Sequence, residues 1–163
     1  MDRLYSPWRY GYVSSTSQPA NGCVFCGAIA DEPLVVARGA AVFVILNLYP
    51  YNSGHLMVVP NRHVASLAQL GAEERSELMA FVQRGEIALN EVYRPQGINV
   101  GLNLGRAAGA GIADHLHIHL VPRWVGDTNF MSVVGETRVL PEEVPASAER
   151  LRPVFARLAG GRD

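Results

Sequence analysis

Three histidines, His115, His117 and His119, lie at alternate positions of one short segment and are separated by aliphatic residues. Successive side chains of an extended strand point to opposite faces, so this spacing places three imidazoles on one face and hydrocarbon on the other. An imidazole is nucleophilic near neutral pH when its second nitrogen keeps a proton held by an acceptor such as a backbone carbonyl, and it also binds metals. The segment therefore predicts a reaction centre.

The two cysteines of the chain, Cys23 and Cys26, form a C-x-x-C pair. In a reducing compartment this spacing indicates half of a zinc site or a redox pair rather than a structural disulfide. A thioredoxin-like motif follows a strand and opens a helix, whereas turn-forming residues precede this pair and Gly27 follows it. The pattern favours a metal knuckle, which needs two further ligands.

The composition is that of one domain with a full core, because 48% of the 163 residues are apolar. We expect an irregular lead-in over residues 1–22 and a single domain over residues 23–163. All fourteen basic residues are arginines and the net charge is −1, which argues against a nucleic-acid polymer as partner and excludes lysine-based chemistry. No apolar run is long enough for a membrane span, so we expect a cytoplasmic protein without membrane contact.

The spacing of apolar residues predicts five strands and two helices. The strands are Leu34–Arg38, Ala41–Asn47, His55–Val59, Ile98–Leu104 and His115–Val121, and the helices are Ala72–Tyr93 and Ala146–Leu158. Pro60 and Pro122 are expected to end the third and fifth strands. Strands gathered around one long helix predict an α+β fold with an antiparallel sheet.

A glycine-rich loop, Gly105–Gly111, joins the fourth strand to the histidine segment. Its small residues let backbone N–H groups approach an anion, although such a loop also serves as a plain hairpin connection. Asn47 and Asn103 each lie near the end of an apolar strand. Sugar or phosphate contact and local turn capping are equally open for both.

These segments together resemble the histidine triad (HIT) superfamily of nucleotide hydrolases and transferases. His115–Val121 resembles the His-φ-His-φ-His-φ-φ motif, where φ is an apolar residue; Asn47–Pro60 resembles the nucleoside pocket, and Gly101–Gly105 the phosphate-side strand. Pro122–Phe130 and Ser6–Arg9 are most similar to the bacterial diadenosine tetraphosphate phosphorylase or hydrolase branch. The resemblance implies a HIT-like fold, in which a five-stranded antiparallel sheet carries one long helix and a C-terminal helix, and a homodimer.

The resemblance also implies roles for single residues in cleaving a dinucleoside polyphosphate by phosphorolysis or hydrolysis. His117 would attack the α-phosphorus and form a nucleotidyl-histidine, His119 would contact phosphate oxygens or the leaving group, and His115 would complete the catalytic triad. The implied nucleotide contacts are Asn47, Asn103, Gly109, Ala110, Gly111, His55 and Trp124. Many relatives carry a hydroxyl donor shortly before the triad, whereas this chain has Gly-Ile-Ala-Asp, which argues against phosphoramidase chemistry.

Zinc-containing members of the superfamily resemble this chain at four positions: Cys23, Cys26, His63 and His115. Two thiolates and two imidazoles would close a tetrahedral site without an open position, so this zinc would be structural. No catalytic metal would be required. The alternatives are a pair of plain thiols and a surface histidine.

Two other functions remain open from the residues alone. The three triad histidines could bind a catalytic metal, which would need an added carboxylate ligand; Asp114 is adjacent but should point to the opposite face. Alternatively, the chain could be a nucleotide-binding sensor without turnover. Trapping of a nucleotidylated histidine would separate catalysis from sensing.

Overall fold

The computed structural model describes residues 22–28, 33–127 and 142–160, so most of the predicted lead-in lies outside the described residues. Five antiparallel strands form one sheet in the order β1-β2-β3-β5-β4. The strands are β1 (Val35–Arg38), β2 (Val42–Leu46), β3 (Leu56–Pro60), β4 (Gly97–Leu102) and β5 (Ile118–Arg123). The helices are α2 (Val24–Ala28), α3 (Ala72–Tyr93) and α5 (Val144–Gly160), with 3-10 turns η1 (Leu67–Gln69) and η2 (Arg106–Ala108). The predicted α+β architecture is confirmed.

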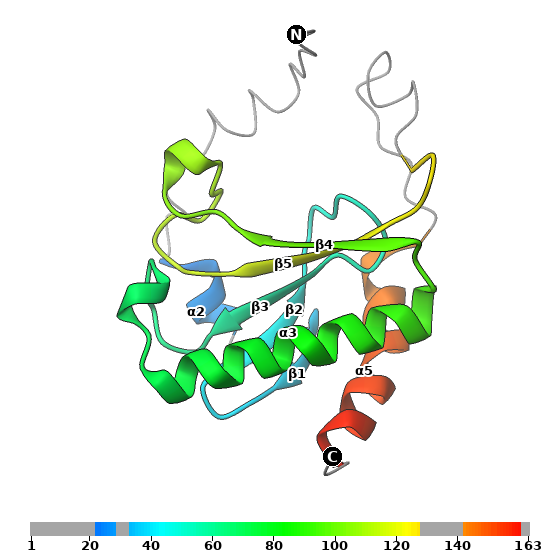
Figure 1. The fold of residues 1–163 in the computed structure, drawn as a ribbon, viewed down its shortest axis with the longest axis horizontal. Coiled ribbons are helices and arrows are strands. Elements are labelled where there is room, and N and C mark those ends of the chain that lie inside the picture. The colour runs from blue at the N-terminus through cyan, green and yellow to red at the C-terminus, as the bar shows by residue number, and fades with distance from the viewer. Residues whose placement is uncertain (1–21, 29–32, 128–141, 161–163) are drawn as a thin grey trace, which may run out of the picture.

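Helices α3 and α5 lie against one face of the sheet (Figure 1). Helix α3 has the predicted bounds, and its apolar stripe is buried as the periodicity requires. Side chains from both helices and from the facing strand positions form one large core. Its fully buried members include Val42, Val44, Leu56, Val58, Leu78, Leu89, Leu120 and Leu151. Within the described ranges, no helix is long and apolar enough to cross a lipid bilayer.

Gly85 lies in the middle of α3, where a glycine weakens a helix by roughly 1 kcal/mol relative to alanine. A Cβ at this position would lie 2.8 Å from Cδ2 of the buried Leu120 in β5. The missing side chain therefore lets the helix approach the sheet directly behind the histidine strand. Packing explains a residue that local propensity disfavours.

The opposite face of the sheet carries a smaller cluster of apolar side chains, over which α2 lies. It comprises Phe25, Ala28, Val35, Phe43, Ile45, Met57 and Val59. Met57 of β3 is directly opposite His119 of β5, and paired residues of an antiparallel ladder share a face. The histidines therefore lie on the α2 face, away from α3 and α5.

The fifth strand begins later than predicted, at Ile118 rather than His115. The register of β3 and β5 would place Pro60 opposite Leu116, and a proline has no N–H to continue the ladder. The N–H of Leu116 instead donates to the carbonyl of Val64, at 2.6 Å. His115 and His117 therefore precede the regular strand, although Leu116 still points into the helix-covered core.

The third strand ends at Pro60 as predicted, whereas the predicted end of the fifth strand at Pro122 was wrong. Pro60 is the last residue of β3, and β5 continues through Pro122 to Arg123. The carbonyl of Pro122 accepts a hydrogen bond from the Asn52 side chain, so the ring nitrogen faces the same side, away from β4. Because β3 no longer pairs with β5 at that point, the missing N–H breaks no ladder bond. The other predicted elements differ from the structure by one or two residues at their ends.

Candidate active site and metal centre

His117 has one ring nitrogen held by the backbone. Its Nδ1 lies 2.8 Å from the carbonyl oxygen of His115. A carbonyl can only accept, so Nδ1 carries the proton and Nε2 keeps a lone pair. The ring is 5% exposed and lies edge-on to His119, with ring centres 4.8 Å apart. This is the proton arrangement that nucleophilic attack through Nε2 needs.

His119 is oriented by a second chain of hydrogen bonds. The N–H of Tyr51, a donor only, points at Nδ1 of His55 at 3.2 Å. The proton of His55 is therefore on Nε2, from which it donates to Nδ1 of His119 at 2.9 Å. His119 consequently carries its own proton on Nε2. His117 therefore has a hydrogen-bond acceptor at its Nε2, whereas His119 has a donor at its Nε2.

Burial keeps the triad histidines uncharged. Desolvation lowers the pKa of His117 below its usual value, and it lowers the pKa of His119 to about 4, with the neighbouring His117 adding to the effect. Desolvation also lowers the pKa of His115. At neutral pH the site therefore contains neutral imidazoles. Each can attack phosphorus through its unprotonated nitrogen without first losing a proton, or donate a hydrogen bond through its N–H.

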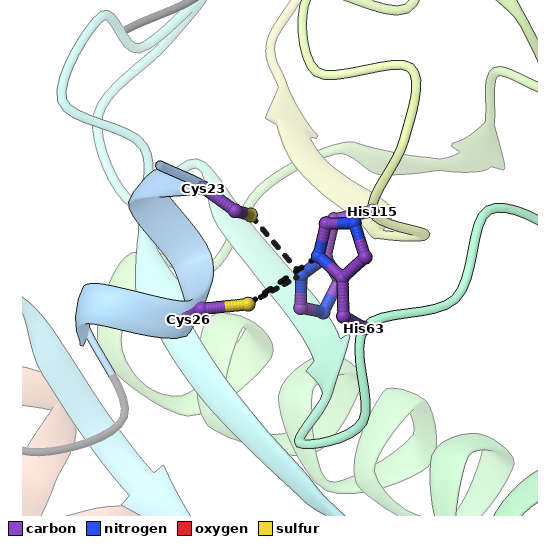
Figure 2. A group of neighbouring side chains, drawn as sticks. All are labelled: Cys23, Cys26, His63 and His115. Carbon is purple, nitrogen blue, oxygen red and sulfur yellow. Dashed lines mark hydrogen bonds between the residues drawn. The ribbon is translucent and has the colours of Figure 1, made fainter. Parts of the chain in front are cut away.

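Four side chains from three separate segments meet beside α2: Cys23, Cys26, His63 and His115 (Figure 2). Their ligand atoms all lie within 4.8 Å of one another. The Sγ of Cys23 is 3.3 Å from Nδ1 of His115, and the Sγ of Cys26 is 3.3 Å from Nδ1 of His63. Bonds of about 2.3 Å to sulfur and 2.0 Å to nitrogen in a tetrahedral zinc site give S···N edges of about 3.5 Å. The cluster has the dimensions and the donor set of such a site.

The orientation of His115 also suits a metal ligand. Its Nε2 lies 2.8 Å from the carbonyl oxygen of Pro60, so Nε2 donates and the lone pair on Nδ1 faces the cysteines. Zinc-binding histidines are commonly oriented by such an acceptor on the second nitrogen. The proline that interrupts the β3–β5 ladder thus supplies the carbonyl that orients this ring.

The alternative of a catalytic metal on the three triad histidines finds no support in the geometry. The Nδ1 atoms of His115, His117 and His119 face the cysteines, a backbone carbonyl and His55, respectively. The Nδ1 lone pairs of His115 and His119 are therefore directed at different partners and do not converge on one ion, whereas Nδ1 of His117 carries a proton. Across the described ranges, the four residues of Figure 2 are the one group of histidine, cysteine and carboxylate side chains close enough to hold an ion. Asp114 is exposed and not part of that group.

Asn47 and Asn103 lie at the ends of strands on the histidine face. The backbone N–H of Asn47 donates to the carbonyl of His55, its Oδ1 accepts from the N–H of Tyr49 at 2.9 Å, and its Nδ2 is 3.4 Å from Nδ1 of His55. Gly101 is opposite His119, so the pleat places Asn103 on the same face. Both asparagines make local turn contacts, and their nucleotide contacts stay a prediction.

The glycine-rich loop contains η2, a 3-10 turn that the sequence did not predict. The N–H of Gly109 donates to the carbonyl of Arg106 at 2.9 Å, and the N–H of Ala110 donates to the carbonyl of Gly105 at 3.4 Å. These two groups therefore bond within the loop in this structure. Asn103 Nδ2 reaches the carbonyl of Gly109 at 3.5 Å. A phosphate role for Gly109, Ala110 and Gly111 stays a prediction.

Trp124 is half-buried and lies in the turn that follows β5. The N–H of Trp124 donates to the Asp127 carboxylate, which also accepts from Arg123 and from the Asn52 side chain. Asn52 belongs to the loop that leads into His55. The turn that carries Trp124 is therefore fastened to the loop before His55, although a stacking role for Trp124 stays a prediction.

Sequence reasoning missed two residues that contact the histidines directly. Phe25 has its ring centre 5.4 Å from that of His115 and 5.1 Å from that of His117. The Tyr51 ring stacks on His55 at 4.9 Å. Tyr51 lies inside the segment that resembled a nucleoside pocket, and Phe25 lies between the cysteines. Both were visible as aromatic residues beside predicted site residues.

Comparisons with known proteins agree with this geometry. A family model described as HIT domain matches residues 31–125. The AP-4-A phosphorylase of Mycobacterium tuberculosis is 44% identical over 167 residues, which cover 96% of this chain and 86% of that protein. The adenosine 5'-monophosphoramidase hnt1 of Schizosaccharomyces pombe is 28% identical over 79% of this chain and 95% of its own length.

Solved structures show the same fold. A Zn-bound histidine triad family protein from Mycobacterium smegmatis superimposes with a TM-score of 0.67 and 28% identity, over 86% of this chain and 98% of that chain. The fold predicted from the sequence is therefore confirmed. Together with the family match and the 44% identical relative, it shows that this chain belongs to the HIT domain family.

Proposed function

We propose that this protein cleaves dinucleoside polyphosphates of the diadenosine tetraphosphate kind by phosphorolysis, through a nucleotidyl intermediate on His117. The observation that carries the proposal is the 2.8 Å contact between Nδ1 of His117 and the carbonyl of His115, because it makes Nε2 the nucleophilic nitrogen. The 44% identical AP-4-A phosphorylase supports the choice of substrate and of phosphate as the final acceptor.

The reaction has two displacements at one phosphorus atom. In the first, Nε2 of His117 bonds to the α-phosphorus, and the bridging P–O bond breaks with its electron pair on the leaving ATP. In the second, an oxygen of inorganic phosphate attacks the same phosphorus, the N–P bond breaks, and ADP is released. The Nε2–H of His119 donates to the charge that develops on phosphoryl or bridging oxygens. Positioning and such charge stabilisation account for most of the catalysis in phosphoryl transfer.

The test is incubation of the full chain with diadenosine tetraphosphate, with and without inorganic phosphate, followed by separation of the nucleotides. We expect ADP and ATP in equal amounts when phosphate is present. AMP and ATP without phosphate would indicate asymmetric hydrolysis, and two ADP symmetric hydrolysis; either pattern contradicts phosphorolysis. Quenching with an alkaline denaturant during turnover should trap nucleotide on His117, because the N–P bond survives base but not acid, and failure to trap any would favour the non-catalytic sensor.

We further propose that Cys23, Cys26, His63 and His115 hold a structural zinc ion. The support is the closeness of the four ligand atoms, the donor set and the Pro60 carbonyl on His115. When bound, zinc would supply a fixed cross-link between α2 and the histidine segment. Metal analysis of the purified protein should give about one zinc per chain. A folded protein with zinc content near zero would contradict the proposal.

The expected homodimer is proposed to form through β4. This strand is at the edge of the sheet, so one side of its backbone lacks a neighbouring strand. Val100 of β4 is 50% exposed, and Ile87 of the adjacent α3 is 42% exposed. A groove of about 360 Å³ lies between these elements. A second copy pairing β4 with β4 would cover the edge and the apolar side chains together.

Sedimentation or light scattering would test the dimer. We expect a dimer for the natural sequence and a monomer for Val100→Glu, because a buried unpaired carboxylate opposes association. Leu48→Glu is the matched control, since Leu48 is 61% exposed in the turn after β2, a strand that does not pair with β4. A monomeric natural protein, or a Val100→Glu variant that still dimerises, would show that another surface or none is used.

A further inference from the structure

Phe25 lies between the two cysteines of the proposed metal site and reaches the proposed nucleophile. It is in α2, its side chain is 3% exposed, and it packs into the cluster on the histidine face. Its ring is tilted by 51° to that of His117 at 5.1 Å and stands edge-on to that of His115 at 5.4 Å. One side of the His117 ring is therefore in contact with the C-x-x-C segment.

His115 makes a second link between the same two sites. Its ring belongs to the group in Figure 2, while its carbonyl holds Nδ1 of His117 at 2.8 Å. The Nδ1 proton of His117 is therefore held by the backbone carbonyl of His115, which is one of the metal-site residues. The His117 ring packs against Phe25, which lies between two others, Cys23 and Cys26. A shift of α2 relative to His115 would therefore alter both the Nδ1 hydrogen bond of His117 and its contact with the Phe25 ring.

Helix α2 cannot hold this position by its own stability. It has five residues, whereas an isolated helix is marginal below about 12–15 residues. Among the described residues, it contacts the body through the buried side chains Phe25 and Ala28, through a hydrogen bond from Arg38 to the carbonyl of Ala28 at 3.4 Å, and through the two cysteines, whose sulfurs lie against His63 and His115. Val24, next to Phe25, is 50% exposed and adds little. Together with the apolar cluster, the cysteines and the two histidines beside them are therefore the contacts that can fix where the Phe25 ring lies.

We propose that Phe25 is a positioning residue for His117 and that the four metal-site residues hold it in place. The Phe25 ring limits rotation of the His117 imidazole, so that Nδ1 stays on the His115 carbonyl and Nε2 stays directed at the phosphorus. This inference rests on the proposed role of His117 as nucleophile. It gives the metal site a second role, beyond stabilising the fold, because reactions of this kind depend on alignment to within about 1 Å.

The first experiment compares Phe25→Leu with Val24→Ala in the full zinc-loaded protein. Leucine keeps apolar volume at position 25 but removes the flat ring, and Val24→Ala alters the neighbouring exposed side chain. For Phe25→Leu we expect unchanged zinc content, kcat lower by about 10- to 100-fold and little change in KM. Val24→Ala should keep the natural kcat. An unchanged kcat, or a higher KM at constant kcat, would overturn the proposal.

The second experiment needs no substrate. Nitrogen-15 NMR of the imidazoles distinguishes a ring locked with its proton on Nδ1 from one that averages between both nitrogens. We expect a locked His117 in the zinc-loaded natural protein, averaged signals in Phe25→Leu and in protein stripped with a chelator, and recovery on adding Zn²⁺. Signals that stay locked in Phe25→Leu and in the stripped protein would overturn the proposal, whether or not the protein cleaves diadenosine tetraphosphate.

Discussion

The two faces of the sheet are built by different means. The face under α3 and α5 is covered by one continuous hydrocarbon core, in which Leu120 and Leu151 are fully buried. The face under α2 has a smaller apolar cluster, and its remaining contacts are hydrogen bonds between rings and carbonyls and the group of cysteines and histidines. The difference indicates that the first face supplies stability, while the second gives up packing to hold imidazoles in defined orientations.

The largest expected effect belongs to the α2 face and concerns activity. His117→Ala removes the atom that forms the covalent intermediate, so we expect kcat to fall by at least about 10⁴-fold, measured as ADP formed from diadenosine tetraphosphate and phosphate. Nucleotide binding and the circular dichroism spectrum should be little changed, because the helix-covered core does not include this side chain. A variant that retains substantial turnover would remove His117 from the mechanism.

The second expected effect belongs to the helix face and concerns stability. Leu151→Ala leaves a cavity at a fully buried position of α5, so the free energy of unfolding should fall by about 2–5 kcal/mol in urea titrations. The kcat of the folded fraction should be unchanged, in contrast with His117→Ala. Val125→Ala, at an exposed position, should alter the free energy of unfolding by less than about 0.5 kcal/mol. A large loss of kcat in Leu151→Ala would mean that the two faces are not separable.

A third, smaller effect tests how much the metal site stabilises the α2 face. With free zinc at a hundred times the dissociation constant, occupancy stabilises the fold by about 2.7 kcal/mol, provided that the unfolded chain does not bind zinc. Chelation should lower the melting temperature of the natural protein, and added zinc should restore it. His63→Ala removes one of the four ligands, so its melting temperature should respond weakly to both treatments. Equal responses in the two proteins would place the metal elsewhere.

The last prediction concerns the pH dependence of stability. The folded chain lowers the pKa of His119 to about 4 from 6.5, mainly through burial, with His117 and His55 as its ring neighbours. Between these values the unfolded chain binds a proton that the folded chain does not, so the free energy of unfolding falls as the pH drops from about 6.5 towards 4. Above that window His119 adds no pH dependence. His119→Gln should show a shallower slope of urea midpoint against pH, and an equal slope would contradict the assignment.

Much of the fold follows from local patterns in the sequence. Helix α3 has the predicted bounds, and its apolar residues recur at the helical period from Leu78 to Val92. The start and the end of β5 did not follow, because they depend on how Pro60 and Pro122 meet the neighbouring strands. The expected cytoplasmic location and single domain over residues 23–163 stay predictions.

The groups that could react can be read from residue types and their spacing alone. Alternation of His115, His117 and His119 with aliphatic residues, together with the C-x-x-C pair, named the imidazoles and thiols that could react, because residue type and spacing carry that information. Which nitrogen bears each proton, and which rings are in contact, depends on how distant segments pack. Phe25 reaches His117, 92 positions away, because α2 packs on the apolar cluster of the histidine face. Tyr51 acts on His119 through His55 because the register of β3 and β5 brings His55 beside His119.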